Sequence, residues 1–190
     1  MERIDLHTHT LASDGSDAPA DVVRKAAALG LRAVAVTDHD TFAGLPEARA
    51  AGQRCGIEVV PGVELSTVWG GEEVHLLGYF MDTEDTALCA LMTRATDERN
   101  ARNETMVQRL HDAGYPITMA DLHAAFPGQT VLGRPHIAAL LVQRGCIASV
   151  PDGMRGLLGR GKEFYVPRYN VPLEAVSYTH LRAHETSAHL

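Results

Sequence analysis

The apolar positions near the N-terminus form short runs that alternate with stretches of helical periodicity. Runs of strand length occupy residues 4–6, 33–36 and 57–60. Helices are predicted between them. The first starts after a capping residue in Ser16-Asp17, with Pro19 in its first turn, and stops at Gly30. The second covers about 45–54 and ends near Gly56. Strand, helix, strand, helix, strand at this spacing predicts a parallel sheet in an α/β fold.

The pattern changes after residue 61. Strand-like runs at 62–69 and 73–80 flank two glycines and predict a hairpin. Helical character follows over 82–112, with shorter helices expected at 119–126 after a Thr118 cap, 135–144 and about 149–158. Strand character returns at 164–166. We interpret 1–81 as the start of an α/β domain, 82–162 as a helical insertion and 163–175 as the return to that domain.

The last fifteen residues, 176–190, have no clear apolar period. Residues 176–186 read VSYTHLRAHET, which resembles the translation of a transposase-end sequencing adapter. We therefore expect 176–190 to be a non-native tail and the chain to be a fragment. The alternative is a native, histidine-rich tail that binds metal. No function is assigned to its histidines, His180, His184 and His189.

Composition narrows the class of protein. The formal net charge of −7 argues against a broadly basic surface, so no stable DNA complex is expected. No apolar run is long enough to span a bilayer, and the N-terminus shows no secretory signal. The three cysteines are odd in number and widely spaced, which is typical of free thiols. These features predict a cytoplasmic protein without a membrane partner.

Histidines and carboxylates gather where the predicted strands end. His7, His9 and Asp14 follow the first strand, and His39 follows the second with Asp38 before it. Glu64 lies just beyond the third strand, and His75 lies across the hairpin from it. Strand ends converge in parallel α/β folds, and imidazole with carboxylate suits Zn, Mn or Fe. The alternative is that these side chains are only structural, but their combination favours a metal cluster bridged by a carboxylate such as Glu64.

A cluster of metal ions suits phosphate ester hydrolysis, because it can activate a hydroxide and neutralise phosphoryl oxygens. Cationic groups are then needed to hold the phosphate. Arg134 and His136 surround Pro135 at a predicted helix start, and Lys162 ends a Gly-Arg-Gly-Lys segment. That segment is only a partial phosphate-loop pattern, so we reject a nucleoside-triphosphate loop. Arg134 and Lys162 could also be solvated surface charges. The charges of the long helix, with Arg99 and Arg102 among them, predict an exposed face.

The same residues carry a family resemblance. The chain resembles the polymerase-and-histidinol-phosphatase (PHP) superfamily over nearly all of 1–175. The matching segments are Asp5-Leu6-His7-Thr8-His9-Thr10, Ser13-Asp14-Gly15, Thr37-Asp38-His39-Asp40, Pro61-Gly62-Val63-Glu64-Leu65-Ser66 and Val74-His75-Leu76-Leu77-Gly78-Tyr79. The insertion looks like the branch that hydrolyses nucleoside 3′,5′-bisphosphates and trims short RNA from the 5′ end.

The resemblance implies a distorted (β/α)7 barrel with three divalent ions, usually Mn, Zn or Fe. Carried over, His7, His9 and Glu64 would hold one ion, Glu64 and His75 a second, and Asp14 and His39 a third; Glu64, Asp14 and His39 would be the catalytic groups. In the family each ion takes further ligands from later in the chain, from an Ala-His-Pro and an Asp-x-His motif, and neither motif follows the helical insertion in this chain. We therefore expect the fragment to be poorly soluble, with little or no activity.

Four functions remain open. The leading one is a phosphoesterase acting on a small phosphorylated substrate, a nucleotide or the 5′ end of short RNA. Histidinol phosphate is a second substrate within the same superfamily. A third possibility is a non-catalytic module that binds metal or a partner, and a fourth is metal-dependent amide hydrolysis. The helical insertion favours nucleotides, and the retained ligands argue against a decayed site.

Overall fold

The computed structural model describes residues 3–167 and 171–176, and it divides into two compact units. Unit 1 comprises 1–96 with 170–190, and unit 2 comprises 97–169. The long helix α3 (Thr86–Asp112) contributes residues to both units. Each unit is described by itself below.

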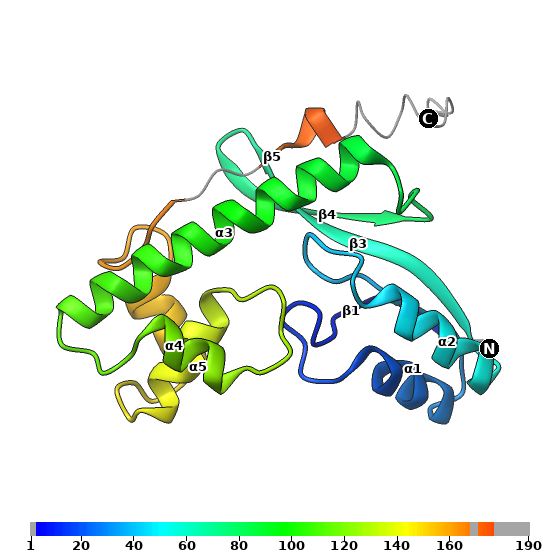
Figure 1. The fold of residues 1–190 in the computed structure, drawn as a ribbon, viewed down its shortest axis with the longest axis horizontal. Helices are drawn as coiled ribbons and strands as arrows, with labels where there is room; N and C mark the ends of the chain where they lie inside the picture. The colour runs from blue at the N-terminus through cyan, green and yellow to red at the C-terminus, as the bar shows by residue number, and fades with distance from the viewer. Residues whose placement is uncertain (1–2, 168–170, 177–190) are drawn as a thin grey trace. The chain divides into compact units, whose positions relative to one another are not determined.

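Unit 1 is built on a mixed sheet with the order β1-β2-β3-β4, where β4 covers Glu72–Tyr79. Figure 1 shows the neighbouring strands β3 and β4 of this sheet. The strands β1 (Arg3–Thr8), β2 (Leu31–Val36) and β3 (Glu58–Trp69) pair in parallel. Helices α1 (Pro19–Ala28) and α2 (Leu45–Cys55) connect them. The predicted α/β class with a parallel sheet is therefore confirmed, whereas closure into a barrel stays a prediction.

The side chains of β2 alternate between two apolar clusters. Val34 and Val36 pack with Val23 of α1 and Ala48 of α2, all at most 1% exposed. Ala33 and Ala35 belong to a separate cluster with Val60 of β3. Because successive side chains of a strand point to opposite faces, both faces of β2 are buried. This burial explains why the run reads as continuously apolar.

The strand β3 is longer than the sequence suggests. The predicted third strand and the first strand of the hairpin form one continuous strand of 12 residues, so the predicted break near Pro61 is wrong. The hairpin itself is confirmed: β3 pairs antiparallel with β4 (Glu72–Tyr79) around Gly70 and Gly71. Both glycines have positive φ, +58° and +83°, as a two-residue hairpin turn of the I′ type requires. A short strand, β5 (Val171–Pro172), pairs in parallel with β3.

Unit 2 is helical. Besides the second half of α3 it contains α4 (Met119–Ala125), α5 (Arg134–Gln143), α6 (Val150–Gly153) and a π-helical turn, η1 (Met154–Leu158). Its core is one apolar cluster whose most buried members include Leu110, Ile117 and Leu141. The Thr118 cap is confirmed, because its side chain accepts from the Asp121 amide at 3.1 Å and the Asp121 carboxylate accepts from the Thr118 amide at 2.9 Å.

Three local predictions are wrong. The first residue before α1 is Ala18, without a side-chain cap, because the Asp17 carboxylate instead binds the ammonium of Lys25 at 2.7 Å. Residues 164–166 are not a strand; Phe164 lies in a turn, and its ring packs edge-on against Tyr115 at 5.7 Å. The predicted exposed face of α3 fails at Arg99 and Arg102, which are 7% and 6% exposed.

The remaining boundary predictions have different outcomes. The interpretation of 82–162 as an insertion stays a prediction. Residues 177–190 of the predicted non-native tail lie outside the described residues; its first residue, Val176, is helical and packs with Val63 and Leu88. Among residues 3–167 and 171–176, no helix combines the length and apolar character that a membrane crossing requires.

Candidate metal centre

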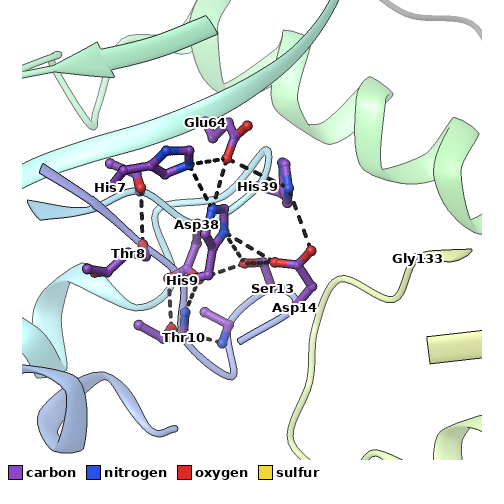
Figure 2. A network of polar contacts seen from close by, with 12 residues as sticks. His7, Thr8, His9, Thr10, Ser13, Asp14, Asp38, His39, Glu64 and Gly133 are labelled. Carbon is purple, nitrogen blue, oxygen red and sulfur yellow. Dashed lines mark hydrogen bonds and ion pairs between the residues drawn. The ribbon is translucent and has the colours of Figure 1, made fainter. Parts of the chain in front are cut away.

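Five predicted side chains of unit 1 meet around the carboxylate of Glu64, which is buried in β3. Figure 2 labels four of them, His7, His9, Asp14 and His39, and the fifth is His75. The Oε2 atom of Glu64 lies 2.8 Å from Nε2 of His7 and 2.9 Å from Nε2 of His9. The same oxygen is 3.8 Å from Nε2 of His39. The other oxygen, Oε1, lies 2.8 Å from Nδ1 of His75. One carboxylate is therefore shared by four imidazoles from three segments of the chain, since His7 and His9 come from the same one.

Asp14 extends the cluster on the side of His9 and His39. Its Oδ1 atom lies 3.2 Å from Nδ1 of His9, and its Oδ2 atom lies 3.7 Å from Nε2 of His39. The centroids of the His9 and His39 rings are 4.8 Å apart, and those of His39 and His75 are 4.9 Å apart. The imidazoles thus form a continuous row along which the two carboxylates lie.

The backbone explains why these segments meet. The residues after β2 continue alongside β3: His39 forms an isolated parallel bridge with Glu64, and the Asp40 amide donates to the Glu64 carbonyl at 3.0 Å. In the hairpin, His75 is opposite Ser66, two residues from Glu64. Side chains two residues apart on a strand share a face, so His75 reaches Glu64 diagonally rather than directly across the hairpin.

Three overlapping groups in this cluster have donor atoms within 4.8 Å of one another. They are His7, His9 and Glu64; His9, Asp14 and His39; and His39, Glu64 and His75. Neutral imidazoles and carboxylates are suitable donors for Zn, Mn or Fe, so the donor set fits divalent ions. Shared members such as Glu64 would let neighbouring ions be bridged.

Protonation in the metal-free protein follows from these contacts. Burial would lower the pKa of His9, but its hydrogen bonds to Asp14 and Glu64 outweigh burial and raise the pKa to about 9. The hydrogen bond to Glu64 raises the pKa of His75 to about 9 as well. Burial would raise the pKa of Glu64, yet hydrogen bonds from His75, His9 and His7 hold it well below its usual range. Without metal, protons on the imidazoles thus balance the buried carboxylate.

The residues predicted to hold phosphate all belong to unit 2. Arg134 lies in the first turn of α5, with its guanidinium 5.7 Å from the centre of the Tyr165 ring. His136 is 4% exposed, and its Nδ1 atom accepts from the Gly133 amide at 2.9 Å. Because Nδ1 accepts, the proton of a neutral His136 ring is on Nε2. Lys162 is exposed in the turn after η1. Their binding of substrate stays a prediction.

Sequence reasoning quoted Asp38 within a motif but gave it no role. The structure places it at 1% exposure, where its carboxylate accepts hydrogen bonds from Thr10 and Ser13 (Figure 2). The available signal was its position directly before His39, at the end of a buried strand. A carboxylate at that position could be a ligand or a support, and only the contacts distinguish the two.

We expect Gly15→Ala to weaken metal binding by about 10- to 100-fold, as changes in the surroundings of metal ligands typically do. A Cβ atom at Gly15 would lie 2.3 Å from the His9 carbonyl oxygen and 2.6 Å from the Thr10 amide nitrogen. Both are backbone atoms, so the loop between His9 and Asp14 must move. Equilibrium dialysis against Mn²⁺ measures the effect. Gly156→Ala is the control, because nothing lies within 4 Å of its added Cβ. Unchanged binding by Gly15→Ala would show that the loop geometry is unimportant.

Comparison with known proteins shows which proteins have sequences similar to this chain. A family model described as PHP domain matches residues 5–144. The 5′-3′ exoribonuclease Rnm of Escherichia coli K12 is 37% identical over 165 residues, which cover 86% of this chain and 56% of the relative. The 3′,5′-nucleoside bisphosphate phosphatase of Chromobacterium violaceum is 35% identical over 174 residues, covering 92% of this chain and 61% of the relative. The chain thus spans little more than half the length of these relatives.

Two solved structures are also similar. One is a metal-dependent phosphoesterase from Bifidobacterium adolescentis, with a TM-score of 0.86 and 32% identity over 92% of this chain and 62% of that one. The other is described as an amidohydrolase from C. violaceum with bound sulfate and no metal. It has a TM-score of 0.87 and 34% identity, covering 95% of this chain and 63% of that chain.

Proposed function

This chain belongs to the PHP domain family, and we propose that it is the metal-binding part of a phosphoesterase that hydrolyses phosphate monoesters of nucleotides. The proposed substrates are nucleoside 3′,5′-bisphosphates or the 5′ end of short RNA. The activities by which the E. coli and C. violaceum relatives are named support both choices. Three divalent ions per complete site, Mn, Zn or Fe, would be the cofactors.

The observation that carries the proposal is the position of Glu64, within 2.9 Å of three imidazole nitrogens and 5% exposed. A buried charge needs compensation, and an arrangement of four imidazoles around one carboxylate is costly for stability alone. Three overlapping donor groups suit a cluster of ions better than a single ion. When bound, such ions supply Lewis acidity and lower the pKa of a coordinated water.

The chain's own residues then have distinct tasks. Glu64 would hold neighbouring ions at a fixed separation, because its two oxygens face different imidazoles. His39 and Asp14 would complete the donor groups next to the reacting phosphate. Their 3.7 Å separation leaves them close enough to share an ion.

Substrate binding is proposed for Arg134, His136 and Lys162. A planar guanidinium can bind two phosphate oxygens at once, and the start of α5 favours anions through its free amides. The Nε2–H of His136 is a possible donor, since Nδ1 already accepts from Gly133.

Amide hydrolysis is the competing reaction, and one solved relative is described as an amidohydrolase. The same structure contains sulfate, which is a tetrahedral oxyanion like phosphate. That observation favours a phosphate ester as the substrate. Histidinol phosphate and a non-catalytic metal-binding module stay as further alternatives.

The decisive test is Mn²⁺-dependent phosphate release from a nucleoside 3′,5′-bisphosphate by the full-length gene product. We expect turnover by the full-length protein and little or none by the 190-residue chain. Arg134→Ala should keep its metal content and lose at least about 10-fold in kcat/KM, as the loss of a charged hydrogen bond implies. Arg109→Ala, an exposed arginine of α3, is the matched control. Metal binding without turnover of any phosphate ester would favour the non-catalytic module.

A further inference from the structure

Asp38 follows β2 and is almost fully buried, yet it belongs to none of the donor groups found among the described residues. Its carboxylate accepts three hydrogen bonds of 2.7 Å: from the Thr10 amide, the Thr10 hydroxyl and the Ser13 hydroxyl. Thr10 and Ser13 are themselves fully buried. A carboxylate with three short bonds inside the protein is a structural acceptor whose oxygens are already used.

All three donors belong to the loop that connects His9 to Asp14. The loop also has internal bonds, because the Thr10 carbonyl accepts from the amides of Ser13 and Gly15, both at 3.0 Å. Asp38 therefore anchors a compact turn whose two ends carry candidate metal ligands. The distance of 3.2 Å between Nδ1 of His9 and Oδ1 of Asp14 depends on that turn.

Ser13 also connects Asp38 to the ring of His9. Its single hydroxyl proton goes to Asp38 at 2.7 Å, because the alternative acceptor, Oδ1 of Asp14, is 3.5 Å away. The Ser13 oxygen is then an acceptor for the Nδ1–H of His9 at 3.4 Å, beside Oδ1 of Asp14 at 3.2 Å. In the neutral ring that binds metal, a proton held on Nδ1 leaves the lone pair on Nε2, the atom that lies 2.9 Å from Glu64.

The backbone of Asp38 reaches a third ligand. Its carbonyl accepts from the Glu64 amide at 3.1 Å, and the next residue in the chain is His39. One residue is thereby tied to His9 and Asp14 through its side chain and to Glu64 through its main chain. Few positions in a sheet edge have this many connections to one cluster.

We propose that Asp38 is a positioning residue: it holds the loop carrying His9 and Asp14. By fixing Ser13 and Asp14 as acceptors beside Nδ1 of His9, it favours the tautomer in which Nε2 of that ring binds metal. This inference rests on the proposed metal site. Asp38 is not itself a metal ligand in this proposal. Asp38 instead affects the coordination geometry and the affinity of the ions that share His9.

A substitution at Gly44, which packs closely against the Asp38 carboxylate, is an independent way to disturb that carboxylate. A Cβ atom at Gly44 would lie 2.7 Å from Oδ2 of Asp38 and 3.1 Å from the Thr10 hydroxyl oxygen. Gly44 precedes α2 with a φ of −76°, which any residue adopts. Gly44→Ala therefore acts on the Asp38–Thr10 pair without changing either residue.

The test compares Asp38→Asn, Ser13→Ala and their double variant with the wild-type chain. Mn²⁺ affinity is measured by equilibrium dialysis, Co²⁺ geometry by visible absorption, and metal-free folding by thermal unfolding in EDTA. We expect Asp38→Asn and Ser13→Ala each to lower the affinity by about 10- to 100-fold and to change the Co²⁺ spectrum. The double variant should lose no more than Asp38→Asn alone, because both act through one chain of hydrogen bonds. Gly44→Ala should change the affinity in the same direction.

Asp17→Asn is the matched control, since the Asp17 carboxylate binds the exposed ammonium of Lys25 at 2.7 Å and its loss should leave metal affinity unchanged. Ser13→Ala leaves the Asp38 carboxylate in place, so it decides the question if Asp38→Asn does not fold. Wild-type affinity and an unchanged Co²⁺ spectrum in both single variants would overturn the inference while leaving the metal site intact. Additive losses that follow the fall in metal-free melting temperature would also overturn it. Failure of the wild-type chain to bind any ion would instead overturn the proposed function, and this inference with it.

Discussion

Glu64→Gln is expected to abolish occupancy of the ions that share Glu64 and, in the full-length protein, the activity that depends on them. Glutamine keeps the shape of the side chain but removes the negative charge. Its amide NH2 group also has no lone pair to offer a metal ion, so one of the two ligand atoms of Glu64 is lost. Glu64 contacts His7, His9 and His75 within 2.9 Å. Asp14 and Glu73 lie beside the opposite nitrogens of His9 and His75, so neither carboxylate occupies the position of Glu64. Changes around metal ligands alone cost about 10- to 100-fold in affinity, so loss of the shared ligand should exceed about 100-fold.

Mn²⁺ content after dialysis and phosphate release by the full-length variant measure this prediction. Glu58→Gln is the control, because Glu58 is exposed at the start of the same strand. Wild-type metal content in Glu64→Gln would contradict the assignment of Glu64 as a bridging ligand. Retained metal with lost turnover would instead assign Glu64 to the chemical step.

The second large effect is on pH. The pKa values of His9 and His75 are raised from 6.5 to about 9 in the metal-free protein, for His9 by hydrogen bonds to Asp14 and Glu64 that outweigh burial, and for His75 by hydrogen bonds to Glu64 and Glu73. An ion can bind only the neutral imidazole, so binding must release these protons. The affinity of an ion held by His9 should therefore rise by about tenfold per pH unit below pH 9, or about 100-fold between pH 6.5 and 8.5.

The metal-free protein should respond in the opposite direction. A raised pKa means that the folded state binds the proton more tightly, so this contribution to stability is complete below pH 6.5 and is lost as the pH rises to about 9. Glu64, whose pKa is lowered, contributes above its ordinary value of 4.5 and loses its contribution as the pH falls below that value. The free energy of unfolding in EDTA should thus decrease from pH 6.5 to 9, while stabilisation by Mn²⁺ increases.

Calorimetric titration with Mn²⁺ at pH 6.5, 7.5 and 8.5, in buffers of different ionisation enthalpy, counts the released protons. His123→Asn is the control, since His123 is an exposed residue of α4 in unit 2. Affinity that does not depend on pH, or binding without proton release, would contradict the prediction and place the ions away from His9 and His75.

Much of the architecture follows from local chemistry that the sequence displays directly. The apolar run of β2 predicts a strand because its alternate side chains fill clusters on both faces of the sheet. The glycine pair Gly70-Gly71 predicts the hairpin because both positions need positive φ. Thr118 predicts the start of α4 because its hydroxyl satisfies a free amide of the first turn. These signals depend on a few neighbouring residues, so sequence reasoning reads them correctly.

The candidate metal site could be predicted from the sequence only in part. The types and order of the candidate ligands are visible in the sequence, because histidines and carboxylates occur directly after the end of each predicted strand. Their approach to one carboxylate depends on contacts far apart in the chain, such as the bridge between His39 and Glu64. The diagonal position of His75 depends on the register of the hairpin, which pairs it with Ser66. Sequence spacing alone does not determine that register to within two residues.

By itself, the sequence determined the α/β class, the elements with strong local signals and the residue types available to bind metal. Only the tertiary structure decided which polar groups are buried and what they contact. Arg99 and Arg102 have the appearance of an exposed helical face but are 7% and 6% exposed, and Asp38 has the appearance of a ligand but supports a loop. The physical reason is that burial and hydrogen bonding of a polar side chain depend on distant segments, whereas turns, caps and strand periodicity depend on adjacent ones.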